Sequence, residues 1–184
     1  MNSAFFINIF RFVGLLAAQI LIFNNIDFLG YVNPFPYILF IILFPVNSNK
    51  TALLASSFLL GIMMDMFSNS GGVHATACLV LAYIRPYIFK FSFGVSYEYQ
   101  TIRLNDVLTP ERFSFILISV VIHHFILFLL EVFQLSFLWD ILLRTILTTT
   151  FSLVVCISLI YIFMLPVLTR FKNSATLVKA ARSN

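Results

Sequence analysis

The amino-acid sequence predicts an all-α integral membrane protein, both from its composition and from the way its apolar residues are grouped. Hydrophobic residues make up 61% of the 184 residues and charged residues only 10%, and the mean hydropathy is +1.02. A soluble globular domain is less apolar and carries about 25% charged residues. The apolar residues also gather in runs that suit membrane-spanning helices of about 20 residues.

Six apolar runs are expected to cross the membrane, which predicts about six transmembrane helices when shorter or tilted runs are accepted. The runs cover residues 4–23, 35–46, 51–67, 74–91, 113–138 and 141–168. Neither an internal repeat nor a Gly/Ser-rich linker divides the sequence. We therefore expect residues 1–184 to form a single polytopic domain that ends in a short basic cytoplasmic tail, residues 169–184.

The first two runs differ from an ordinary span. The first contains Arg11 and Gln19 and is followed by no small-residue cleavage site, so an uncleaved span is expected rather than a signal peptide. The second is short and is bracketed by Pro34, Pro36 and Pro45, and proline interrupts helices. Residues 35–46 therefore either span or form a re-entrant or interfacial segment.

The distribution of basic residues predicts that both termini are cytoplasmic. With six spans, Lys and Arg fall in the inner segments, whereas the three outer loops near residues 24–33, 68–73 and 139–140 contain none. This asymmetry follows the positive-inside rule. Arg11, Arg85 and Lys90 are expected to extend toward the cytoplasm from the inner halves of their spans. The net charge of +4 is not concentrated in one dense run, so nucleic acid is not an expected partner.

Charged residues in the outer half of the predicted bundle suggest an ion pair. At 1.5 Å per helical residue, Asp65, Glu131 and Arg144 lie at similar depth, and His74 opens the fourth span on the same side. Opposite charges reduce each other's cost in the membrane. Arg144 is therefore expected to pair with Asp65 or Glu131, the alternative being that these side chains extend to the outer interface.

The remaining polar residues indicate helix packing rather than chemistry. His123 and His124 are adjacent and point about 100° apart on a helix, which favours separate hydrogen bonds between helices over a metal site. Cys78 and Cys156 lie in apolar runs and are expected to pack as small hydrophobic residues. Phosphate-binding loops, zinc-protease motifs and a nucleophile with its base are all missing from the sequence. Neither an enzyme nor a cofactor is predicted.

A short segment between the third and fourth runs carries a more specific pattern. Gly61 and Asp65 are one helical turn apart, so Gly61 offers a flat surface beside the carboxylate where another helix can approach. The pattern continues through the next helix. Its residues are Gly61, Asp65, Ser68, Gly72, His74, Ala75, Tyr83, Arg85 and Pro86.

This segment resembles the rod shape-determining MreD family, whose hallmark is a G-x-x-x-D helix end, a turn, and G-x-H-A opening the next helix. Chain length, hydrophobicity and the basic tail are also similar, although Gly71 stands where many members have proline. The resemblance implies packing roles for Gly61, Asp65, Gly72 and His74. It also implies a fold similar to the membrane substrate-binding subunits of energy-coupling-factor transporters.

The function that the resemblance implies is non-enzymatic. MreD-like proteins are components of the bacterial cell-elongation machinery in the inner membrane and bind MreC. In a larger assembly with MreB, RodA and a class B penicillin-binding protein, they link the cytoskeleton to peptidoglycan synthesis. The alternative is a vitamin-binding subunit of an energy-coupling-factor-type transporter, in which Asp65, His74, Glu131 and Arg144 would line an outer pocket.

Overall fold

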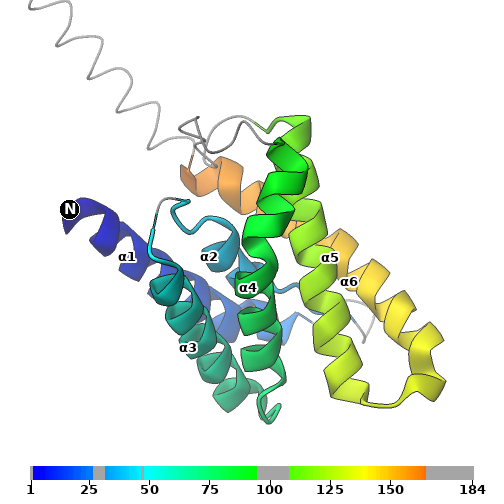
Figure 1. Ribbon diagram of the computed structural model, residues 1–184. Coiled ribbons are helices and arrows are strands. Elements are labelled where there is room, and N and C mark those ends of the chain that lie inside the picture. The colour runs from blue at the N-terminus through cyan, green and yellow to red at the C-terminus, as the bar shows by residue number, and fades with distance from the viewer. Residues whose placement is uncertain (1, 27–31, 47, 95–107, 165–184) are drawn as a thin grey trace, which may run out of the picture.

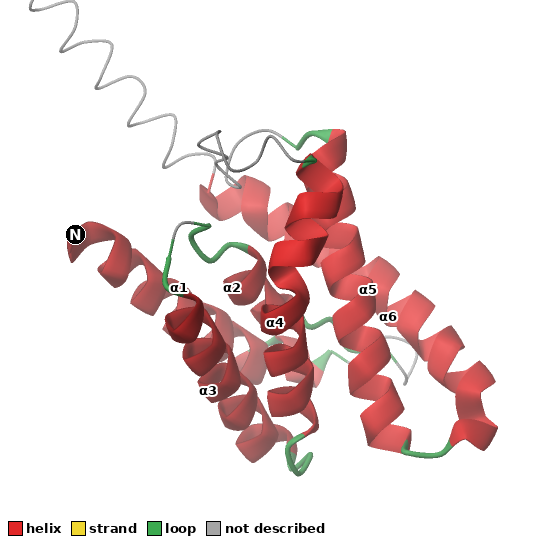
Figure 2. Ribbon diagram, viewed as in Figure 1, coloured by secondary structure: helices red, strands yellow, loops and turns green. Residues whose placement is uncertain are grey.

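The computed structural model describes residues 2–26, 32–46, 48–94 and 108–164, and within these ranges every regular element is helical (Figures 1 and 2). The long helices are α1 (Asn2–Leu21), α3 (Lys50–Ser68), α4 (Val73–Phe93), α5 (Pro110–Val132) and α6 (Leu138–Leu159). The short elements are η1 (Phe23–Asn25), η2 (Pro36–Ile38), α2 (Leu39–Ile42), η4 (Leu135–Phe137) and a π-helical turn, η5 (Ile160–Met164). The predicted basic tail lies outside the described residues.

Four helical segments of the described chain are long and apolar enough to cross a membrane, which confirms an all-α membrane protein. They are Phe6–Asn25, Lys50–Ser68, Pro110–Val132 and Leu138–Ile162. Helix α4 is of similar length, with 21 residues, but contains His74, Arg85 and Lys90 and does not belong to this group. It packs between α3 and α5, where His74 and Arg85 are buried.

Helices α3, α4, α5 and α6 run alternately up and down and pack in chain order (Figure 1). This brings the start of α3, the end of α4 and the start of α5 to one end of the bundle, which we call the basic end. Lys50, Lys90 and Arg112 lie there. The described turns at the opposite end, residues 69–72 and 133–134, contain neither lysine nor arginine.

The second apolar run does not form a spanning helix. Residues 36–42 form only η2 and α2, and residues 36–44 are all buried, with at most 7% of any hydrophobic side chain exposed. Proline explains the short helix, because Pro34 and Pro36 precede it and Pro45 follows it. Irregular backbone at membrane depth is tolerated where protein surrounds it. Of the two alternatives left open for this run, a full helical span is therefore excluded.

The central segment, residues 34–46, nevertheless carries the chain back along α1. Gln19, near the end of α1, bonds to Pro34 and Tyr37, whereas Arg11, near the middle of α1, bonds to Leu43. The segment therefore runs antiparallel to α1 and returns toward the basic end. It forms the centre of the largest hydrophobic cluster among the described residues.

Candidate functional site

The carboxylate of Asp65 caps the N-terminus of α4. Its Oδ1 accepts a hydrogen bond from the backbone N–H of His74 at 2.9 Å, and its Oδ2 accepts one from Ala75 at 2.8 Å. The hydroxyl of Ser70 donates to Oδ1 as well. Gly72 occupies the cap position of α4 and has no side chain to supply. Asp65, from the preceding helix, therefore satisfies donors that a helix start leaves unpaired and places a negative charge at its positive end.

Gly61 lets α3 and α4 approach each other one turn before Asp65. A Cβ added at Gly61 would lie 2.4 Å from Cα of Ala75 and 2.7 Å from the carbonyl oxygen of His74. Both atoms belong to the backbone of α4, so neither can move aside as a side chain would. We call the contact made by Gly61, Asp65, Gly72, His74 and Ala75 the α3–α4 clasp.

The turn inside the clasp needs residues that accept a positive φ. Asn69 has φ 53°, Gly71 has φ 64° and Gly72 has φ 99°. Glycine takes such angles readily, whereas proline is fixed near −65°. A proline in place of Gly71 would therefore require another turn geometry.

Arg144 lies closest to Glu131 rather than to Asp65. Its Nη1 is 3.9 Å from Oε1 of Glu131, and the two side chains are 41% and 51% exposed. A contact this long and this exposed contributes little to stability. Of the two partners expected for Arg144, the structure brings Glu131 near it, whereas Asp65 takes part in the clasp.

A buried hydrogen-bond chain joins the clasp to the middle of the bundle. The side chain of His74 meets the hydroxyl of Tyr37 at 2.8 Å through Nδ1, and the same hydroxyl meets Nε2 of His123 at 3.0 Å. Cys78 Sγ lies 3.8 Å from that nitrogen. A phenol donates only one hydrogen bond, so one of the two imidazoles must donate to it. Helices α4 and α5 are thus both tied to the central segment.

His124 points to the other side of α5 and contacts α6. Its Nδ1 lies 3.1 Å from Oγ1 of Thr149, and its Nε2 lies 3.5 Å from Oγ of Ser152. Ser152 accepts a hydrogen bond from the backbone N–H of Phe35 at 3.1 Å. The two histidines therefore make separate hydrogen bonds between helices, as their spacing predicted.

Two arginines bind the C-terminal end of the short helix α2. Arg85, which is 5% exposed, donates through Nη2 to the carbonyl oxygens of Ile42 and Phe44. Arg11 donates through Nη1 to the carbonyl oxygen of Leu43 at 3.2 Å. A cation is favoured at a helix C-terminus, where carbonyl groups lack partners. The expectation that Arg85 extends toward the cytoplasm is wrong, because its side chain is buried and donates to carbonyl groups of the central segment. Arg11 is half-buried and also donates to that segment.

Gln19 completes the same arrangement at the beginning of the central segment. Its Nε2 donates to the carbonyl oxygen of Pro34 at 3.0 Å and to Oδ1 of Asn24 at 2.9 Å, and its Oε1 accepts from the N–H of Tyr37 at 3.4 Å. Sequence reasoning did not assign roles to Gln19, Tyr37 or Ser152. The sequence did contain a signal for such roles. The prolines around residues 35–46 imply unpaired backbone groups there, which need hydrogen-bond partners from other helices.

Together these contacts form a helix-packing centre. The polar groups expected to line an outer pocket are distributed differently: Asp65 and His74 are buried and bonded within the bundle, while Glu131 and Arg144 lie partly exposed beside each other. Comparison with protein-family models, with curated proteins and with solved structures finds no match to this chain.

Proposed function

We propose that this protein is a non-enzymatic component of the bacterial cell-elongation machinery that resides in the inner membrane and binds MreC. In this proposal both termini face the cytoplasm, and the protein helps to maintain rod shape within an assembly that includes MreB, RodA and a class B penicillin-binding protein. The α3–α4 clasp is the observation that supports it. Five of the nine residues that carry the resemblance to the MreD family meet in this contact, in which Gly61 allows close approach and Asp65 caps the next helix.

A packing role suits the clasp better than a ligand-binding role. Both carboxylate oxygens of Asp65 accept backbone N–H groups, and His74 is hydrogen-bonded to Tyr37. A vitamin-binding subunit would need such groups turned toward its ligand. The clasp instead fixes the angle between α3 and α4 and so shapes the surface that these helices offer to a partner.

Affinity purification of the tagged protein from its own membranes in mild detergent tests the proposal. Mass spectrometry of the bound material is expected to identify MreC together with wall-synthesis enzymes. Recovery of a transporter's energising subunit with paired ATPases, or of a vitamin in stoichiometric amount, would replace this proposal with vitamin uptake.

The variant Asp65→Ala then tests the role of the clasp. Without the cap, α4 should shift relative to α3, so we expect several-fold less MreC per tagged protein and rounded cells, although the protein still reaches the membrane. Asp140→Ala is the matched control, because Asp140 is an exposed carboxylate in the first turn of α6 and should leave MreC recovery unchanged. Equal recovery from both variants would contradict the role given to the clasp.

A further inference from the structure

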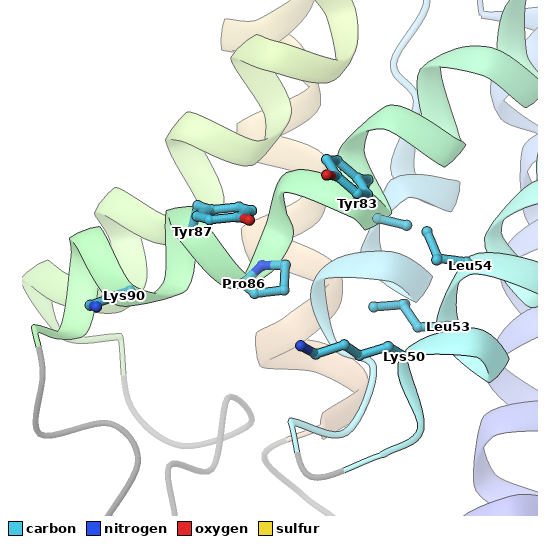
Figure 3. A pocket seen from close by; sticks show the side chains of 8 residues that line it. Lys50, Leu53, Leu54, Tyr83, Pro86, Tyr87 and Lys90 are labelled. Carbon is cyan, nitrogen blue, oxygen red and sulfur yellow. The ribbon is translucent and has the colours of Figure 1, made fainter.

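A groove opens between α3 and α4 at the end of this helix pair that lies away from the clasp. It has a volume of about 370 Å³, and Figure 3 shows the residues that line it. They are Lys50, Leu53 and Leu54 from α3, and Ala82, Tyr83, Pro86, Tyr87 and Lys90 from α4. The spacings of three, four and seven residues place each set on one face of its helix.

The lining is polar at one end and apolar along the rest. Lys50 is the first residue of α3 and Lys90 lies in the last turn of α4, so both ammonium groups belong to the basic end. Toward the middle of the bundle the lining changes to leucine, alanine and proline, with Ala82 and Tyr83 furthest from Lys90 along α4. Seven residues separate Tyr83 from Lys90, a distance of roughly 10 Å along the helix.

We propose that this groove binds an anionic phospholipid from the leaflet at the basic end, independently of the function proposed above. The lipid phosphate lies between the ammonium groups of Lys50 and Lys90, and one acyl chain follows Leu53, Leu54 and Pro86 toward Tyr83. Lysine attracts phosphate as a compact charge. The apolar lining fits an acyl chain and gives no support to a free phosphate ion.

The distribution of charge also selects the type of lipid. The basic end is the cytoplasmic end under the positive-inside rule, and the cytoplasmic leaflet is rich in anionic lipids that attract basic residues near its surface. Two lysines at the mouth of one groove discriminate by charge, so phosphatidylglycerol should bind in preference to phosphatidylcholine.

Tryptophan quenching measures this preference directly. The sequence has one tryptophan, Trp139, which is exposed in α6 near the opposite end. The double variant Tyr83→Trp/Trp139→Phe moves the reporter into the groove by exchanging one exposed aromatic side chain for another. In phosphatidylcholine vesicles, brominated phosphatidylglycerol is expected to quench this reporter with a binding constant about fivefold or more above that of brominated phosphatidylcholine.

Two comparisons assign the preference to the lysines. Adding Lys50→Gln and Lys90→Gln together to the reporter variant should reduce the ratio of the two lipids' binding constants to about one. Adding Lys50→Arg and Lys90→Arg together should keep the ratio, because arginine retains the charge. The native reporter Trp139 should give a ratio near one throughout. A ratio near one at position 83, a ratio that survives both glutamines, or an equal preference at positions 83 and 139 would each overturn the proposal.

Discussion

At the scale of single residues, Asp65 and Gly61 both contact the backbone of α4. A carboxylate in the apolar part of a membrane costs about 2.5–3.5 kcal/mol on insertion scales. Hydrogen bonds from the N–H groups of His74 and Ala75 offset this cost for Asp65, since bonds to an ionised acceptor are strong. Those bonds are possible because Gly61 lets the two backbones come together.

The variant Gly61→Ala is expected to destabilise the protein by about 2–3 kcal/mol, because the new methyl group would overlap the backbone of α4 and force the helices apart. Unfolding by sodium dodecyl sulfate in mixed micelles, followed by circular dichroism, measures the change.

Gly14→Ala provides the control for the same substitution in another helix. A Cβ at Gly14 meets nothing within 4 Å, so the change should be neutral or stabilise by up to about 1 kcal/mol through helix propensity. If Gly61→Ala and Gly14→Ala lowered the free energy of unfolding by similar amounts, the contact between Gly61 and Ala75 would be unimportant for stability.

At the scale of elements, the central segment explains why polar residues occur in several apolar helices. A short helix with irregular flanks leaves backbone groups without partners inside the bundle. Gln19 and Ser152 bond to its beginning, and Arg85 and Arg11 bond to its end. These side chains let the chain return through the bundle without a full helix.

Replacing Arg85 by Met is expected to cost about 2–4 kcal/mol, because the carbonyl groups of Ile42 and Phe44 would stay buried without this donor. Arg85→Lys should recover only part of the loss, since a single ammonium group lacks the planar fork of the guanidinium. The same unfolding assay measures both variants. Phe91→Met serves as the control: Phe91 is exposed on the same helix and does not line the groove, so a change above about 0.5 kcal/mol there would argue against a specific role for Arg85.

At the scale of the whole molecule, the two ends of the bundle differ in charge. The basic end carries Lys50, Lys90 and Arg112, and the groove opens beside it. The central segment runs back along α1, so the turn after α1 and the turn after α3 are brought to the same end. By the positive-inside rule, this charge difference predicts that the basic end faces the cytoplasm.

Cysteine labelling tests the arrangement of the two ends. A membrane-impermeant maleimide should label Asn25→Cys and Ser68→Cys on intact cells, but Glu111→Cys only after permeabilisation. All three positions are exposed, and the native Cys78 and Cys156 are buried, which keeps the background low. If one of positions 25 and 68 were labelled on intact cells and the other only after permeabilisation, the central segment would not return the chain across the membrane.

The sequence by itself determined the class of the protein, because composition and long apolar runs depend on no particular packing. It also determined the turn at Gly71 and Gly72 and the close approach at Gly61, since these follow from local conformation and from the absence of a side chain. The proline residues around 35–46 indicated an interruption, although they left open whether the segment spans.

Only the tertiary structure decided which polar groups meet. From depth alone, Arg144 was expected to pair with Asp65 or Glu131. Depth does not specify rotation about the helix axis, and the carboxylate of Asp65 faces the start of α4 while Glu131 lies near Arg144. Arg85 was expected to extend toward the cytoplasm, but it binds carbonyl groups more than 40 positions away in the sequence. Partners separated by whole helices are set by how the helices pack, because local periodicity contains no information about which neighbour a face will meet.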